Sequence, residues 1–184
     1  MYKRQTAQVD FFTIATAGNA ADFGDASSST AIMPAAGSST TRALFAGGYT
    51  PSASDTIDYF TIASAGNATD FGNLVSARKN IGGLSSSTRT LIGGGGYPSA
   101  VNSIDYVTTA TTGNAQDFGD LTLARGIAHG TSNQTRGIFM GGSTNPARQN
   151  TIDFVTVATT GNASDFGDFT TAKQNGGVAS DSHG

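Results

Sequence analysis

Apolar residues along this chain come in short runs, separated by stretches rich in Ser, Thr, Asn and Gly. Around residue 100 the pattern predicts strands over 81–87, 89–94, 103–109 and 118–123. In the third of these strands, Ile104 and Tyr106 share one face under the two-residue period. Alanine is common but follows no 3.6-residue stripe, so the pattern favours short strands and turns over helices.

The same pattern recurs along the whole chain. The tripeptide Asp-Phe-Gly starts at four positions 47 or 48 residues apart, namely Asp22, Asp70, Asp117 and Asp165. Each copy is preceded by Gly-Asn-Ala and, further upstream, by Ile or Val, then Asp, then an aromatic residue. A Thr-Arg step leading to paired glycines occurs three times, at Arg42, Arg89 and Arg136. We interpret residues 1–184 as a single repeat array without a linker or a second domain.

The length of the unit indicates the architecture. Units of 40–50 residues with four short strands bury their apolar faces by stacking radially, which predicts an all-β fold of the β-propeller type. Leucine-rich, ankyrin and tetratricopeptide repeats need helical periods that this sequence lacks, and a parallel β-helix needs shorter coils.

The unit resembles the kelch-like propeller repeat. Leu44–Gly48, Asp58–Tyr59, Phe71 and Arg78 stand where that family has a strand ending in a glycine pair, an Asp-aromatic strand, a second aromatic residue and an Arg. Phe replaces the family's usual Trp, and the Arg position holds Thr30 in the first copy and Lys173 in the fourth. The Gly-Asn-Ala and Ser-Ser-Thr-Arg steps are also similar to repeat proteins of marine bacteriophages, which implies a virion or tail-fibre component.

Composition narrows the function classes. Only 12% of the residues are charged and the formal net charge is −3, so no basic surface for nucleic acid is expected. The absence of cysteine excludes disulfides and thiolate chemistry. No apolar run approaches the ~20 residues of a membrane span, and the N-terminus lacks the apolar segment of a signal peptide. We therefore expect a virion or extracellular-surface location without membrane insertion.

The recurring motifs are expected to be structural. In each Asp-Phe-Gly step we expect a turn in which Asp accepts backbone N–H groups, Phe packs between sheets and Gly supplies a positive φ. The aromatic residues concerned are Phe23, Phe71, Phe118 and Phe166. Arg42, Arg89 and Arg136 are expected to pair with the recurring acids Asp58, Asp105 and Asp153.

No catalytic, metal or cofactor site is predicted. Asp22/Asp25 and Asp117/Asp120 offer too few oxygens for the 6–8 ligands of calcium. His129 and His183 are the only histidines, and we interpret His129 as a satisfied polar residue rather than a catalytic one.

Binding remains as the expected activity. In propellers the loops joining strands two to three and four to one share one face. Aromatic and basic residues suit recognition there, and the candidates are Tyr49, Tyr97, Arg78, Arg125, Arg148 and Lys173. A simple solvated rim is the alternative interpretation. We expect a non-enzymatic structural or adhesive protein; the alternative is a stand-alone lectin-like propeller for cell-surface glycans.

The register of the repeat also predicts a split unit. The chain opens with strands three and four of a unit, and residues 176–181 correspond to strand one of another, so strand two is missing. We expect a second chain, either another copy or another virion protein, to fill or bypass this slot by strand donation or by the joining of two open arcs. Continuation of the repeat in a longer protein is the alternative.

Overall fold

The computed structural model describes residues 7–28, 34–96, 98–126 and 128–180. These residues form four antiparallel sheets and contain no helix, which confirms the all-β prediction. Accordingly, the described part of the chain has no helix long and apolar enough to cross a membrane.

The first sheet has two strands, and each of the other three sheets has four strands in chain order. The first sheet pairs β1 (Gln8–Phe11) with β2 (Ala21–Asp25). The other strands are β3 (Ala35–Ser38), β4 (Arg42–Ala46), β5 (Thr56–Thr61), β6 (Thr69–Asn73), β7 (Gly82–Ser85), β8 (Arg89–Gly93), β9 (Ser103–Thr108), β10 (Gln116–Asp120), β11 (His129–Ser132), β12 (Arg136–Met140), β13 (Gln149–Thr156) and β14 (Ser164–Lys173).

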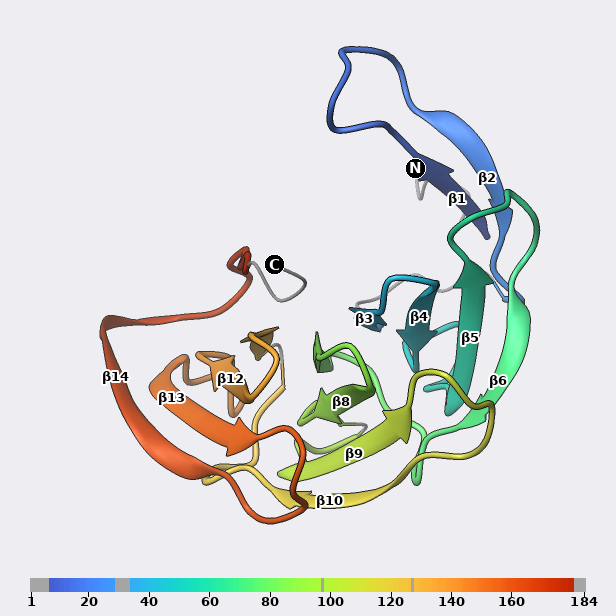
Figure 1. Cartoon of the computed structure of the whole chain (residues 1–184). Coiled ribbons are helices and arrows are strands. Elements are labelled where there is room, and N and C mark those ends of the chain that lie inside the picture. Colours follow the sequence, from blue (N-terminus) through green and yellow to red (C-terminus); the bar gives the residue numbers. More distant parts are fainter. Residues whose placement is uncertain (1–6, 29–33, 97, 127, 181–184) are drawn as a thin grey trace.

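The sheets follow one another along an open arc (Figure 1). The fourth strands β6, β10 and β14 lie on the outer rim, and the first strands lie toward the inside of the arc. The first strands are tied together by Ser85, whose Oγ accepts from the Ser38 amide and whose carbonyl accepts from Ser132 Oγ. They approach so closely that a Cβ on Gly83 or Gly130 would overlap the backbone of the neighbouring strand, which explains why these strands are rich in glycine.

Each Asp-Phe-Gly step is a β-bulge rather than the expected turn. In β10, Asp117 lies opposite Asp105 and Gly119 lies opposite Ile104, so Phe118 is the extra residue. The register shifts at the same place in the other three sheets. The positive φ predicted for the glycine is confirmed, at 138–146° in the four copies.

The apolar core lies between successive sheets. One cluster joins the second and third sheets and includes Ile57, Phe71, Ile92 and Val107. A second cluster joins the third and fourth sheets and includes Leu91, Ile104, Phe118, Phe139 and Val155. Both faces of the third sheet are therefore covered, and β8 is buried along almost its whole length.

The Gly-Asn-Ala step of each sheet binds the outer strand of the preceding one. The Gly66 amide donates to the Phe23 carbonyl (2.7 Å), the Ala68 amide donates to the Asp25 carbonyl (2.8 Å), and Asn67 Oδ1 accepts from the Asp25 amide (3.0 Å). The same three bonds recur between the second and third sheets and between the third and fourth sheets, at 2.7–3.1 Å. The motif is thus a connector between sheets.

The segment predicted to be strand one of another unit is not a strand. Residues 176–180 instead lie against β11 through two hydrogen bonds. His129 Nε2 accepts from the Gly176 amide (2.7 Å), and Thr131 Oγ1 donates to the Ala179 carbonyl (3.3 Å). Asp181 lies outside the described residues.

Candidate functional site

A polar hollow of about 570 Å³ lies where the loops of the second, third and fourth sheets meet. It is lined by side chains and backbone from the β6–β7, β8–β9, β10–β11 and β12–β13 loops, together with Gln174, which follows β14. These are the strand two-to-three and strand four-to-one loops that the sequence assigned to one face. The lining residues are Lys79, Asn80, Gly95, Gly96, Pro98, Ser99, Ala100, Gly126, Ser143, Asn145, Pro146 and Gln174.

Backbone bonds between loops hold the hollow open. The Gly96 amide donates to the Lys79 carbonyl (2.9 Å), and Gly126 and Ser143 exchange both amide–carbonyl bonds (2.9 and 2.8 Å). Asn80 takes a left-handed conformation at φ 59°, which Asn tolerates better than most residues. The loops are therefore pre-ordered, which lowers the entropic cost of holding a ligand.

The chemistry of the hollow is that of hydrogen bonding with one positive charge. Lys79 is the only charged residue among the described residues that line it, and its Nζ lies 4.0 Å from the centre of the Tyr49 ring. Amides of Asn and Gln, hydroxyls of Ser and backbone groups supply its other polar atoms, and Pro98, Ala100 and Pro146 supply apolar surface. Such groups both donate and accept, as the hydroxyls of a sugar require.

Two predicted recognition residues turn out to be internal. Arg78 and Arg125 are 1% and 0% exposed, and each forms an ion pair of 2.9 Å with an acid of the next sheet, Asp105 and Asp153 respectively. Their guanidinium groups also donate to the Ile92 and Phe139 carbonyls, both at 3.2 Å. This corrects the expectation that they belong to an exposed binding surface, because both guanidinium groups are buried between sheets and paired with carboxylates.

The other predicted binding residues are dispersed. Tyr49 contacts Lys79, which lines the hollow. Arg148 is exposed on the β12–β13 loop. Lys173 is exposed at the end of β14, and its Nζ lies 5.1 Å from the centre of the Phe169 ring. Tyr97 lies outside the described residues.

The Thr-Arg arginines do not pair with the recurring acids, contrary to expectation. Arg89 stacks over the Tyr106 ring (4.7 Å) and donates to the Val157 carbonyl of the next sheet (3.1 Å). Arg42 does the same with Tyr59 and Thr109, and Arg136 stacks over Phe154. Asp105 and Asp153 are already engaged by Arg78 and Arg125, which approach from the preceding sheet, and Asp58 accepts hydrogen bonds from Ser27.

Burial changes the ionisation of one ion pair and one imidazole. Desolvation raises the pKa of the Asp105 carboxyl, while Arg78 and the Val75 amide oppose that rise. Desolvation also lowers the pKa of His129, whose Nε2 accepts the Gly176 amide in the neutral form. His183 lies outside the described residues, and those residues contain no group of three or more His, Cys, Asp or Glu side chains that could hold a metal.

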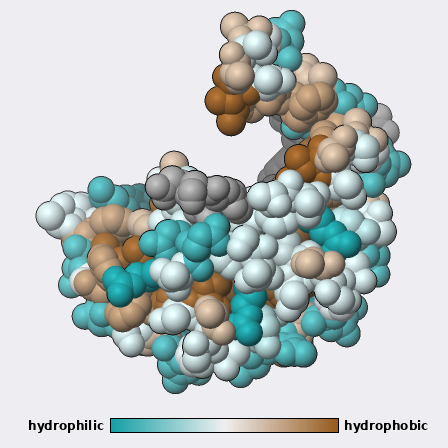
Figure 2. Space-filling view, in the orientation of Figure 1, coloured by the Kyte–Doolittle hydropathy of each residue, from teal (hydrophilic) through white to brown (hydrophobic). Residues whose placement is uncertain are grey.

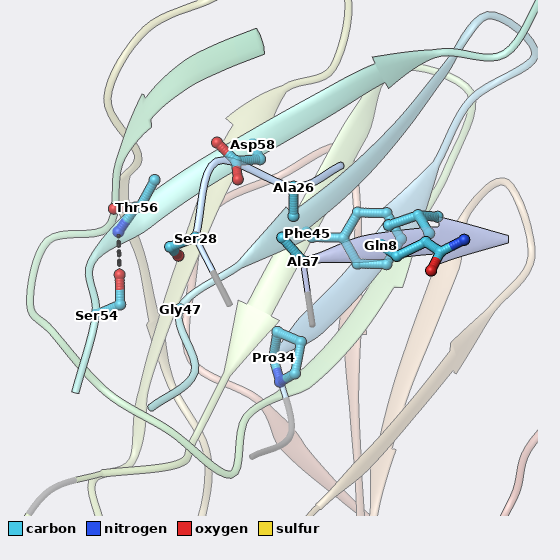
Figure 3. A pocket seen from close by; sticks show the side chains of 11 residues that line it. Ala7, Gln8, Ala26, Ser28, Pro34, Phe45, Gly47, Ser54, Thr56 and Asp58 are labelled. Atoms are coloured by element: carbon cyan, nitrogen blue, oxygen red, sulfur yellow. Dashed lines mark hydrogen bonds between the residues drawn. The ribbon is translucent and has the colours of Figure 1, made fainter. Parts of the chain in front are cut away.

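A second, smaller cavity of about 180 Å³ lies between β1 and the second sheet (Figure 3). It is lined by Gln8, Phe45 and Asp58 among others. Asp58 is 6% exposed; its Oδ2 accepts from the Ser27 amide and hydroxyl, and its Oδ1 has no hydrogen-bond partner among the described residues. Asp105 and Asp153 have an Arg at the corresponding place, whereas the first copy has Thr30, which lies outside the described residues.

Sequence reasoning missed the amides of the hollow, Asn80 and Gln174. For Asn80 the available signal was an Asn two residues after the Arg or Lys of a unit, which recurs at Asn175 with the same φ of 59°; no such signal marks Gln174. No protein-family model matches the sequence, and no curated protein is significantly similar to it.

Proposed function

We propose that the chain is a non-enzymatic adhesive repeat protein of the propeller type, whose loop-side hollow binds carbohydrate. The observation that carries this proposal is the hollow itself, since its volume of about 570 Å³ lies in the range of small-ligand sites. Its lining of amides, hydroxyls and one Lys suits neutral or acidic sugars.

The distribution of polar residues supports a binding role over catalysis. The recurring Asp, Asn and Arg side chains bond one sheet to the next, as Asn67, Asn114 and Asn162 do. The loops that line the hollow differ from unit to unit, so they provide the variable surface that recognition needs.

A glycan array tests the proposal directly. We expect the chain to bind a restricted set of glycans, and the double variant Lys79→Ala/Gln174→Ala to bind at least about tenfold more weakly, or 1.4 kcal/mol. Thr160→Ala is the matched control, because Thr160 is exposed on the β13–β14 loop at the opposite ends of the strands. Absence of glycan binding by the folded chain would contradict the proposal.

The resemblance to bacteriophage repeat proteins extends the proposal to a virion or tail-fibre component. We expect the chain to co-purify with particles in a fixed ratio. Glycan binding without such co-purification would favour the alternative of a stand-alone lectin.

A further inference from the structure

The two ends of the arc carry complementary halves of the contact that joins its sheets. Among the described residues no sheet precedes β1–β2, so the first Gly-Asn-Ala step (Gly18, Asn19 and Ala20) has no outer strand to bind. Likewise no described sheet follows β14, so Phe166, Gly167 and Asp168 have no Gly-Asn-Ala step bound to them.

The space around the glycine of each Asp-Phe-Gly step differs between the internal sheet contacts and the end of the arc. A Cβ on Gly24, Gly72 or Gly119 would lie well under 3.0 Å from the carbonyl oxygen of the following sheet's Gly-Asn-Ala glycine. At Gly167 a Cβ would meet nothing within 4 Å. A neighbouring backbone therefore approaches Gly24, Gly72 and Gly119 closely, and none of the described residues approaches Gly167 in this way.

Apolar side chains are exposed at both ends for the same reason. Phe12 is 69% exposed, whereas its repeat equivalents Phe60, Val107 and Val155 are each 3% exposed. Figure 2 shows hydrophobic surface on the arm that carries β1 and β2.

At the other end, Phe166 is 52% exposed, whereas its equivalents Phe71 and Phe118 are each 2% exposed. Within the chain, the corresponding pair Phe23 and Phe60 packs edge to face at 5.6 Å between ring centres. Phe166 and Phe12 occupy the repeat positions of Phe23 and Phe60, but they lie at opposite ends of the arc.

Charge is complementary as well. Asp10 is exposed and occupies the repeat position of Asp105 and Asp153, while Lys173 is exposed and occupies the position of Arg78 and Arg125. A sheet pair formed by these two ends would therefore place opposite charges where the internal sheet pairs have their buried ion pairs.

We propose that a second copy of this chain docks head to tail on the first. The leading face, defined as Asp10, Phe12 and residues 18–20, binds the trailing face, defined as residues 166–168 and Lys173 of β14. The Gly18 and Ala20 amides donate to the Phe166 and Asp168 carbonyls, Asn19 accepts from the Asp168 amide, Phe12 packs on Phe166, and Asp10 pairs with Lys173. This contact does not depend on carbohydrate binding.

Light scattering on a sizing column tests the proposal with the full chain. We expect the parent chain to run as a dimer or a larger assembly, and Phe12→Glu and Phe166→Glu each to run as monomers. Mixing these two variants leaves one intact leading face and one intact trailing face, so the mixture should form complexes of one copy each. Val75→Glu is the control for an added charge, because Val75 is 62% exposed and lies on neither face.

A second trailing-face variant guards against misfolding, because Phe166 also contacts Phe154 at 6.1 Å between ring centres. Lys173→Glu changes an exposed side chain and should weaken self-association at least tenfold, and adding Asp10→Lys to the same chain should restore it. A parent chain that stays monomeric would overturn the proposal. Dimers that persist in Phe166→Glu and Lys173→Glu, or a mixture of Phe12→Glu and Phe166→Glu that stays monomeric, would also overturn it.

Discussion

At the level of single residues, the two recurring arginines of the second and third units have different roles. Arg78 and Arg125 neutralise a buried acid, whereas Arg42 and Arg89 cover an aromatic ring and donate to a carbonyl of the next sheet. Arg136 covers Phe154 in the same way, but no described sheet follows it to accept its hydrogen bond.

Comparing Arg89 with Arg136 therefore measures the effect of one hydrogen bond between sheets, from Arg89 to the Val157 carbonyl. We expect Arg89→Ala to lower the free energy of unfolding by roughly 1–3 kcal/mol, because it removes a partly buried, charge-assisted bond together with the stacking. Arg136→Ala should cost less, since only the stacking is lost. Chemical denaturation in the Phe12→Glu background keeps self-association out of the comparison. Equal losses in both variants would contradict this assignment.

Asp105 pairs with Arg78, whereas none of the described residues provides a cation at Asp58. Asp58→Asn keeps an oxygen for Ser27 and removes a buried charge that has one unbonded oxygen, so stability should stay within about 1 kcal/mol or rise. Asp105→Asn leaves Arg78 buried without a counter-charge and should cost about 3 kcal/mol. Thermal or chemical unfolding measures both, and a similar cost for the two would show that Asp58 has a cationic partner after all.

At the scale of elements, the bulge at each Asp-Phe-Gly step and the Gly-Asn-Ala connector of the next sheet fit together. The bulge in the outer strand turns the extra Phe toward the next sheet and places a glycine where the connector's carbonyl approaches. Each outer strand is thereby paired on both sides, except β14, which lacks the second partner among the described residues. Unpaired outer strands are the usual places for association between chains.

The segment 176–180 is held by a bond that depends on pH. The pKa of His129 in the folded chain is lowered by burial from its ordinary value of 6.5, so the unfolded or undocked state binds the proton more readily. The stabilising contribution is full above pH 6.5 and is lost as the pH falls through the lower folded pKa. Protonated His129 can no longer accept from the Gly176 amide, so the segment should leave β11.

Hydrogen exchange of the Gly176 amide measures this release. We expect its protection factor to fall between neutral and mildly acidic pH, and to be low at every pH in His129→Ala. A protection factor that does not change on acidification would show that Thr131 and Ala179 hold the segment without the imidazole.

At the scale of the whole molecule, much of the fold followed from the repeat period. The strands predicted around residue 100 match β7, β8 and β9 within about two residues, because their apolar runs end at glycines or polar turns. The last strand was displaced, since β10 begins at Gln116, before the Asp-Phe-Gly step that was taken for a turn. A bulge has no signature that distinguishes it from a turn in a single sequence, because both use glycine at positive φ.

The sequence by itself determined the unit: its length, its four short strands and the glycines that take a positive φ in the Asp-Phe-Gly steps. Only the tertiary structure decided which arginine meets which acid, because the partners lie on different sheets and the bulge sets the face from which each approaches. Arg89 lies over Tyr106 on one face of its sheet, so Asp105 on the opposite face is left to Arg78. The same packing buried two predicted binding residues and assembled the hollow from amides on separate loops, which local patterns along the chain could not bring together.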